Sequence, residues 1–581
     1  MRKVGSSVAL ALLVVGCGPS APPVAKPATT PWIERSNANA QVLMALEVEL
    51  TPERASQFGV EEADERTMDI GPGFRERLVA GLRKALTELQ RRRAAETDPL
   101  VAGDLDILVH ATDLRIRELE LDDKTRVPYA DVAQLVFGGI HTLLDEQASP
   151  ARRARALTRI KRYAGLVPGT RPVTELARED TDAHFARGLL PPSRIEVEKG
   201  LATSAPMRES MEKLFQKYKI EGADEALKTF ATQLAAYDDY LRTTVLPKTR
   251  ADFALPPQVY AMRLERSGID ISQDKLVALA HEQFDSIQAE MKKVAADVAR
   301  ERGFASADYR DVLRELKKEQ LAGDAILPHY LNRLSELEAI IRREHLVTLP
   351  ARKARIRLAT PGEAARQPAP NMEPPRLVGN TGEQGAFVLP LGGVGTQKYD
   401  DFTYAAASWT LTAHEARPGH EMQYASMVER GLSLARARYA MNSVNMEGWA
   451  LYSEAITLPF MPAEGKLVSL DFRLLRAARA FLDPELQQGK WTFDSARAFL
   501  EKEIVASPAF SAEEVERYTF KMPGQAPSYL YGYTRIMALR KEVEQRLGAR
   551  FNAQEFHDAI LAEGLLPPDL MRAAILKKFG L

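Results

Sequence analysis

The most informative part of this chain is the stretch from residue 413 to residue 423, which reads AHEARPGHEMQ. Two histidines, His414 and His420, flank Glu415 within it. A catalytic zinc ion is held by three protein side chains, often histidines, and works with a carboxylate that takes a proton from water. The residue types therefore predict a metal site in which His414 and His420 are ligands and Glu415 is the general base.

The spacing of the two histidines requires an interrupted helix, because they are six positions apart. On an unbroken helix, six residues turn the chain by about 600°, which leaves the two side chains about 240° apart. Pro418 has no N–H for the carbonyl of His414, and Gly419 can adopt a positive φ at little cost. We expect these two residues to loop out and return His420 to the His414 face. The alternative is a pair of structural histidines around a turn.

A third ligand is expected in residues 445–454, which read NMEGWALYSE. Glu447 follows His420 by 27 positions (447 − 420), which leaves room for one helix, a turn and the start of a second helix. Glu447 and Glu454 share a helix face but lie about 10 Å apart along the axis, so they cannot both bind one ion. We assign Glu447 to the metal, because Gly448 allows a close approach, and Glu454 to orienting a ligating histidine. The alternative is that both are surface carboxylates.

Three motifs resemble those of one bacterial family. They are His-Glu-Ala-x-Pro-Gly-His-x-x-Gln from His414 to Gln423, Glu-Gly-Trp-Ala-x-Tyr-x-Glu from Glu447 to Glu454, and Pro-Gly-Gln-Ala-x-x-Tyr-x-x-Gly from Pro523 to Gly532, followed by Leu539-Arg540. The chain resembles the family catalogued as domain of unknown function 885, which is similar to the helical gluzincin peptidases. The resemblance implies a mainly α, gluzincin-like metallopeptidase fold with a small β-sheet beside the active site. It also implies one zinc ion per chain, bound by two histidines and a glutamate, with Gln423 supporting the site from behind the ligands.

A peptidase of this kind also needs a donor for the oxygen that gains negative charge during the reaction. The resemblance points to Tyr529 for this role. Tyr533 lies one helical turn further on the same face, and Tyr531 is adjacent, so either could replace it; aromatic packing is the alternative for all three. Arg540 could bind a substrate carboxylate in bidentate fashion, although an ordinary salt bridge is the competing interpretation.

The first residues resemble a bacterial lipoprotein signal. Residues 8–15 form an apolar run too short to span a bilayer, and Cys17, the single cysteine, follows it closely. The pattern predicts a signal peptide over 1–17 with lipidation of Cys17, and a flexible tether rich in Pro and Ala over 18–37. Gly18 is typical of lipoproteins sent to the outer membrane, so we expect an outer-membrane lipoprotein that faces the periplasm. The alternative is a cleaved signal peptide with an incidental cysteine.

The composition is that of an ordinary globular protein. The 581 residues are 45% apolar and 27% charged, and their formal net charge is −1, which argues against a nucleic-acid partner. The chain is too long for one small core. We therefore expect an N-terminal helical region at 38–250 and a catalytic zinc-binding region at 251–581.

Hydrophobic periodicity predicts helices along most of the chain. The clearest runs from Gln273 to Arg302, where apolar residues recur at three- and four-residue steps. Two short segments have the pattern of strands, 355–358 and 386–391, and Pro390 in the second suits an edge strand. We expect a surface loop over 361–376, where prolines are dense.

Together these patterns predict a zinc-dependent metallopeptidase that hydrolyses peptide bonds in a peptide or oligopeptide substrate. Two alternatives stay open. One is a catalytically inactive binding or scaffold lipoprotein that keeps the metal fold, although an intact Glu415 argues against it. The other is a metal-dependent amidase that acts on cell-wall material or another non-peptide amide. We expect contact with the membrane through the lipid anchor, and nothing in the sequence indicates an obligate protein partner.

Overall fold

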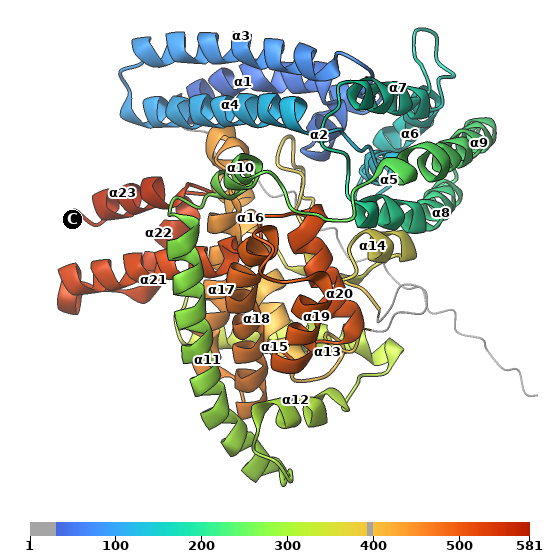
Figure 1. Ribbon diagram of the computed structural model, residues 1–581. Coiled ribbons are helices and arrows are strands. Elements are labelled where there is room, and N and C mark those ends of the chain that lie inside the picture. Colours follow the sequence, from blue (N-terminus) through green and yellow to red (C-terminus); the bar gives the residue numbers. More distant parts are fainter. Residues whose placement is uncertain (1–30, 392–398) are drawn as a thin grey trace, which may run out of the picture.

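The computed structural model describes residues 31–391 and 399–581, and this part of the chain is mainly α-helical (Figure 1). The predicted architecture, many helices with one small sheet, is confirmed. The N-terminal helices are α1 (Pro31–Leu50), α2 (Pro52–Gln57), α3 (Phe74–Ala95), α4 (Pro99–Thr125), α5 (Val132–His141), α6 (Pro150–Tyr163), α7 (Val173–Ala186), α8 (Arg194–Lys217) and α9 (Asp224–Tyr240).

The second half of the chain contributes the remaining helices and all three strands. Its helices are α10 (Pro257–Ser267), α11 (Gln273–Arg302), α12 (Tyr309–Lys317), α13 (Gly323–Arg343), α14 (Pro361–Arg366), α15 (Ala407–Leu411), α16 (His420–Arg430), α17 (Ser443–Thr457), α18 (Ala463–Gln487), α19 (Phe493–Glu503), α20 (Pro508–Glu516), α21 (Ser528–Leu547), α22 (Ala553–Ala562) and α23 (Pro568–Lys578). The strands are β1 (Arg355–Leu358), β2 (Asn371–Glu373) and β3 (Ala386–Leu389).

Helix α11 has the ends that its sequence predicts. The Ser272 side chain accepts a hydrogen bond from the backbone N–H of Lys275, and Gly303 ends the helix with a φ of +70°. A serine at the N-cap and a left-handed glycine after the last turn are favourable helix ends. The prediction of a helix from Gln273 to Arg302 is confirmed.

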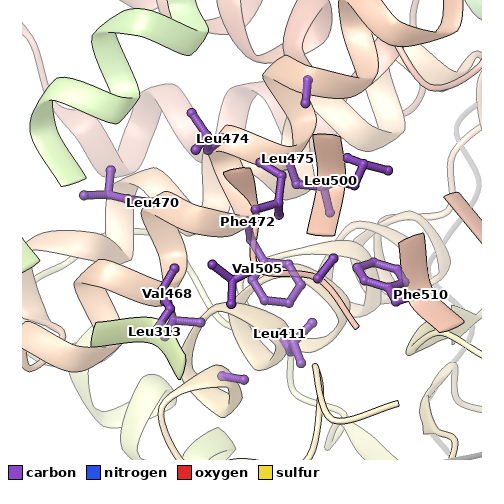
Figure 2. Packing of buried hydrophobic residues seen from close by; sticks show 14 of the residues in the cluster. Leu313, Leu411, Val468, Leu470, Phe472, Leu474, Leu475, Leu500, Val505 and Phe510 are labelled. Carbon is purple, nitrogen blue, oxygen red and sulfur yellow. The ribbon is translucent and has the colours of Figure 1, made fainter. Parts of the chain in front are cut away.

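Helices α11 and α18 form the centre of the second half. Helix α18 is buried on nearly all its faces, which is typical of a helix inside a large core. Figure 2 shows Phe472 of α18 near Leu411, the last residue of α15, and near Phe510 of α20; all three belong to one hydrophobic cluster. The residues just before the His414 motif are therefore fixed against the largest hydrophobic cluster.

The small sheet differs from the prediction in two ways. Its strand order is β1-β3-β2, so β3 is the central strand and not an edge strand. Pro390 removes no hydrogen bond from the ladder because β3 ends at Leu389. The expected surface loop at 361–376 is also wrong, since it holds α14 and β2. Thr360 and Glu363 form a capping box that starts α14, a signal that the high proline content obscured.

Helix α1 corrects the predicted tether, which was expected to extend to residue 37. The helix begins at Pro31, and Ile33, Ser36 and Ala40 lie on its buried face. The Ser36 hydroxyl donates to Asp104 of α4 at 2.5 Å. These contacts order residues 31–37, whereas Cys17 and the predicted signal peptide lie outside the described residues.

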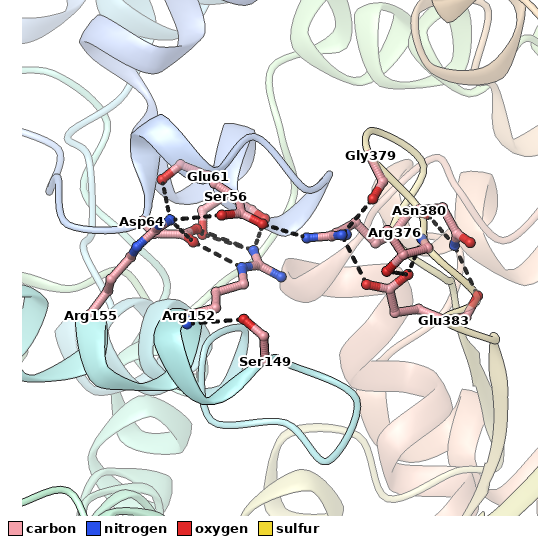
Figure 3. Close-up of polar contacts among 11 residues, drawn as sticks. Ser56, Glu61, Asp64, Ser149, Arg152, Arg155, Arg376, Gly379, Asn380 and Glu383 are labelled. Carbon is pink, nitrogen blue, oxygen red and sulfur yellow. Dashed lines mark hydrogen bonds and ion pairs between the residues drawn. The ribbon is translucent and has the colours of Figure 1, made fainter. Parts of the chain in front are cut away.

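The predicted boundary near residue 250 falls in the loop before α10. Buried side chains between Val132 and Val245 form a hydrophobic cluster of their own. Polar contacts fasten the N-terminal helices to the loop before β3 (Figure 3). Arg376 of the loop pairs with Glu61 at 3.0 Å, and Arg152 of α6 donates to the nearby Asp64 at 2.9 Å within the N-terminal part. Within residues 31–391 and 399–581, no helix is long and apolar enough to cross a membrane.

Candidate metal centre

The helix that carries His414 is interrupted where the sequence predicts. A π-helical turn, η4 (Thr412–Ala416), follows α15, and Arg417 is extended with φ −125° and ψ 132°. The Arg417–Pro418 peptide bond is cis, and α16 then begins at His420. Single π turns within helices are frequent at functional sites. The interruption brings the two imidazole rings to 4.9 Å between centroids.

Gly419 serves this interruption for a reason other than the one predicted. Its φ is −77°, so the expectation of a positive φ is wrong. A Cβ atom at this position would lie 1.9 Å from the carbonyl oxygen of His414. Glycine is therefore required because the returning chain passes directly against the backbone of the preceding turn.

The second motif holds the interruption in place. The Trp449 indole N–H donates to the carbonyl oxygen of Pro418 at 2.9 Å, and the Ser453 hydroxyl donates to the same oxygen at 3.2 Å. Both side chains come from α17 and are fully buried. Helix α17 thus satisfies a carbonyl that the broken helix leaves without an intrahelical partner.

His414, His420 and Glu447 meet in one cluster, in which one ligand atom from each lies within 4.8 Å of the other two. The Glu447 Oε2 atom is 3.3 Å from His420 Nε2 and 3.7 Å from His414 Nε2. Two ligands of one tetrahedral zinc ion, at bond lengths of about 2.0–2.2 Å, lie roughly 3.3–3.5 Å apart. Within the part of the chain that the structure describes, Glu447 Oε2 is buried and has no hydrogen-bond partner. The donor set therefore fits one zinc ion, whose fourth ligand in catalytic sites is a water.

Glu454 orients the first histidine. Its Oε1 lies 2.7 Å from His414 Nδ1, which directs His414 Nε2 toward Glu447. Its Oε2 accepts a hydrogen bond from the Thr410 hydroxyl at 2.6 Å, and Arg476 of α18 lies 3.7 Å from the carboxylate. A carboxylate behind a histidine is the usual support of a metal ligand. The sequence indicated Glu454 but not Thr410 or Arg476, which come from other elements.

The electrostatics of the cluster suit a cation. Burial lowers the pKa of His414, but the neighbouring carboxylates of Glu447 and Glu454 outweigh it and raise this pKa to about 9. Burial raises the pKa of Glu447, yet the two nearby histidines hold it well below its usual range. Burial also raises the pKa of Glu415, which the neighbouring histidines oppose. An ionised Glu447 therefore faces a protonated His414, and a divalent cation that binds there displaces that proton.

The third motif reaches the cluster through Gln525, which the sequence analysis did not single out. The Gln525 amide N–H donates to Ser443 at 2.7 Å and to Glu447 Oε1 at 3.3 Å. Arg517 donates to the amide oxygen of Gln525 at 2.6 Å. Gln423, expected to support the ligands, instead donates to Asn445 at 2.9 Å and ties α16 to α17. The position of Gln525 within the Pro-Gly-Gln-Ala motif was the available signal.

Gly448 has a different neighbour from the one expected. A Cβ atom there would lie 2.5 Å from the backbone of Gly532, and a Cβ on Gly532 would lie 2.0 Å from the carbonyl oxygen of Val444. The close approach that Gly448 permits is therefore between α17 and α21, not between backbone and metal. This contact places the third motif beside the second.

Of the three tyrosines considered, Tyr529 lies at the cluster. Its ring stacks on that of His414, with 6.1 Å between centroids. The Arg517 guanidinium donates to its hydroxyl oxygen at 2.7 Å, which leaves the hydroxyl hydrogen free to donate. Burial raises the pKa of Tyr529, although Arg517 lowers it, so the hydroxyl is protonated at neutral pH.

The other two tyrosines have different surroundings. The Tyr531 hydroxyl donates to Asp270 and accepts from Arg535 at 2.9 Å, so it is committed to a contact with the chain before α11. The ring of Tyr533 lies 5.3 Å from the Arg473 guanidinium and packs in a hydrophobic cluster with Ile536 and Leu539. Neither contact directs a hydroxyl at the histidines.

Arg540 forms hydrogen bonds to neighbouring side chains of the protein. Its Nε donates to Glu544 at 2.7 Å, and its Nη1 donates to the Tyr452 hydroxyl at 3.0 Å. Tyr452 in turn contacts His557 Nε2 at 2.7 Å. The competing interpretation, a structural salt bridge, is the one that the geometry favours.

A second group of possible ligands, His141, Glu363 and Glu373, also lies within 4.8 Å. Here a guanidinium already fills the space, because Arg357 donates to Glu363 at 3.0 Å and to Glu373 at 2.6 Å. The group is a salt-bridge network between α5, α14 and the sheet. It contrasts with the cluster at His414, where no arginine or lysine of the described residues forms an ion pair with the carboxylate of Glu447.

Comparisons with known proteins show which folds the chain resembles and which family it belongs to. Its fold is similar to the crystal structure of a protein from Colwellia psychrerythraea, provisionally described as a lipoprotein, with a TM-score of 0.78 at 17% identity over 95% of this chain and 100% of that one. A protein of unknown function from Shewanella oneidensis, described likewise, gives a TM-score of 0.67 at 20% identity over 94% and 100%. A comparison with curated proteins gives no match. The model of a family described as bacterial protein of unknown function (DUF885) matches residues 52–575, and the chain therefore belongs to that family.

Proposed function

We propose that this protein is a zinc-dependent metallopeptidase of the bacterial cell envelope. The observation that carries the proposal is the convergence of His414, His420 and Glu447 beside the buried carboxylate of Glu415. Two imidazoles, one ligating carboxylate and an adjacent base are the parts that hydrolysis of an amide bond requires. The same site, by its ligands alone, would also suit an amidase for non-peptide substrates.

When bound by these three side chains, a zinc ion supplies polarisation of the scissile carbonyl and a lower pKa for the attacking water. Glu415 takes the proton from that water and passes it to the leaving amine. Its burial suits this exchange, because a carboxylate with a raised pKa returns a proton readily. Tyr529 donates its hydroxyl hydrogen to the oxygen that gains negative charge, while Arg517 holds the phenol in place.

The location in the cell envelope rests on two supports. Cys17 follows a short apolar run in the manner of a lipoprotein signal. Two proteins of similar fold are provisionally described as lipoproteins. The proposal includes an outer-membrane anchor and a catalytic body on the periplasmic side.

The first test is a count of bound metal on the full-length protein in mild detergent. We expect about one zinc per chain in the wild type and loss of the ion in His420→Ala. The control is His281→Ala, since His281 of α11 stacks on Phe481 and pairs only weakly with Glu485. Wild-type protein that takes up no zinc when supplied with it would refute the proposal and favour a binding lipoprotein.

The second test is turnover of a peptide library by zinc-loaded protein, with Glu415→Gln as the inactive reference. We expect cleavage by the wild type and a loss of at least about a hundredfold in the variant, because the general base is removed. Zinc binding with no peptide cleavage, but with release of amine from cell-wall fragments, would replace the peptidase assignment by an amidase.

A further inference from the structure

A large cavity connects the candidate metal centre with the N-terminal helices. Its volume is about 880 Å³, and Glu447 and Gln525 form part of its wall. Helices α3, α4, α8 and α10 contribute the rest of the lining, together with the loop before α21. Because Glu447 is a candidate metal ligand, a molecule that reaches the metal centre from this side passes through the cavity.

One side of the cavity carries several arginines around a single carboxylate. Glu118 of α4 is almost fully buried and accepts hydrogen bonds from Arg115 and Arg266, each at 2.6 Å. Arg263 donates to the same carboxylate. Three guanidiniums therefore share one negative charge.

The neighbouring turn of α4 repeats the arrangement. Asp122 pairs with Arg263 at 2.6 Å and with Arg126 at 3.3 Å. We call the four arginines that surround Glu118 and Asp122 the arginine wall: Arg115, Arg126, Arg263 and Arg266. Glu196 also lines the cavity and lies near Arg126, so four guanidiniums face three carboxylates, which leaves one positive charge in excess (4 − 3) on this side of the cavity.

The arginine wall has hydrogen-bond donors to spare. A guanidinium carries five N–H groups. Arg115 and Arg266 each donate through Nη1 to Glu118. Among residues 31–391 and 399–581, the buried Nε of Arg126 has no hydrogen-bond partner. An incoming carboxylate can pair with such groups in bidentate fashion and balance the excess charge.

The rest of the lining suits a peptide chain. The lining also includes apolar side chains, among them Leu78, Met441, Met446, Phe520 and Met522. Ligand cavities of small molecules and short peptides range over about 300–1,000 Å³. The space therefore suits an oligopeptide of a few residues better than a folded protein.

We propose, resting on the peptidase function proposed above, that the substrates are short oligopeptides that carry a carboxylate away from the scissile bond. This carboxylate, from an acidic side chain or from the peptide's C-terminus, binds to the arginine wall. The scissile bond then lies at His414, His420 and Glu447. The arginine wall thus selects acidic peptides and sets where on the peptide cleavage occurs.

The test uses full-length, zinc-loaded protein in mild detergent and three fluorescent hexapeptides. One has a glutamate, the second has glutamine in its place, and the third has glutamine with an amidated C-terminus. Binding is measured by anisotropy with Glu415→Gln, and hydrolysis with otherwise wild-type protein. Each measurement is repeated with Arg266→Gln, and with Arg83→Gln as control, because Arg83 of α3 is exposed, pairs with Glu120 and does not line the cavity.

We expect the glutamate peptide to bind and react about tenfold better than the neutral amidated one, since a charge-assisted pair is worth on the order of a tenfold change. Arg266→Gln should lower that preference about fivefold, whereas Arg83→Gln should leave it unchanged. A preference that disappears only on amidation would assign the carboxylate to the C-terminus. Equal binding of all three peptides, or a preference that Arg266→Gln does not alter, would overturn the inference while turnover still supports the peptidase. Tight binding of the acidic peptide without any turnover would support the arginine wall and refute the peptidase.

Discussion

Replacing Glu454 with glutamine should weaken zinc binding while the overall fold is kept. The glutamate accepts from Thr410 at 2.6 Å and holds His414 Nδ1 at 2.7 Å, so both of its oxygens are used. A glutamine of the same shape keeps one acceptor but places an amide N–H against the other partner. His414 then loses the carboxylate that fixes its ring, and Arg476 becomes a buried cation without its neighbour at 3.7 Å.

The size of the effect follows from what each contact does. Loss of a carboxylate behind a ligating histidine typically lowers metal affinity by about 10–100-fold, or roughly 1.4–2.7 kcal/mol. Leaving Arg476 unpaired in the interior should lower the free energy of unfolding by about 3 kcal/mol more. At a zinc concentration about 1,000 times the wild-type Kd, zinc stabilises the wild type by about 4.1 kcal/mol. If the variant's Kd is 100-fold higher, the same zinc concentration stabilises it by only about 1.4 kcal/mol.

The assay is a competition between the protein and a chelating dye, together with urea unfolding at several zinc concentrations. Glu544→Gln is the matched control, because Glu544 is half-buried and pairs with Arg540 outside the cluster. A folded Glu454→Gln protein whose zinc Kd stays within about twofold of wild type would refute the role assigned to Glu454. Reduced stability without a change in Kd would show that the residue only neutralises Arg476.

Three further changes have defined outcomes. Gly419→Ala should lower the free energy of unfolding by about 3 kcal/mol and abolish zinc binding, because the new Cβ would lie 1.9 Å from a carbonyl oxygen. In the same urea assay the control Gly103→Ala, in α4 with no heavy atom near the new Cβ, should be neutral or stabilising. Tyr529→Phe should reduce kcat/KM by about a hundredfold with unchanged zinc content, and equal loss of both would contradict its role as a donor. Burial raises the pKa of Asp483 to about 7, although its carboxylate accepts from Gly524 at 3.0 Å. Folding therefore favours the protonated carboxyl, and the free energy of unfolding falls as pH rises from about 4 to about 7. Asp483→Asn should flatten this fall of the free energy of unfolding with pH in urea titrations. An unchanged pH dependence would exclude Asp483 as its source.

Local signals in the sequence predict the parts of the structure that depend on neighbouring residues. The ends of α11 follow from Ser272 and Gly303, which act within one turn of the helix. The interruption between His414 and His420 follows from Pro418, whose missing N–H removes a hydrogen bond from the helix at that turn. Such features need no knowledge of distant contacts, so the sequence is sufficient for them.

The remaining features depend on residues that are far apart in the chain. Pro390 resembled an edge-strand residue because the pairing of β3 with β1 and β2 cannot be read from β3 alone. The motif marks Gln525, but the sequence does not show that it contacts Glu447, since 78 positions separate them. Arg540 pairs with Glu544, which is four residues away in the sequence. Its second contact, to the Tyr452 hydroxyl, is 88 positions away, so the sequence alone could not show that Arg540 belongs to a structural network and not to a substrate site.

The assembly of the centre depends on one helix contact more than on any ligand. Gly448 and Gly532 let α17 and α21 approach so closely that a Cβ atom on either would overlap the other's backbone. That approach places Glu447 within reach of Gln525 and places Tyr529 against the ring of His414. A larger residue at either glycine would move the third ligand and the tyrosine away from the histidines together. The two glycines therefore couple the ligand set to the donor, although neither touches a reacting group.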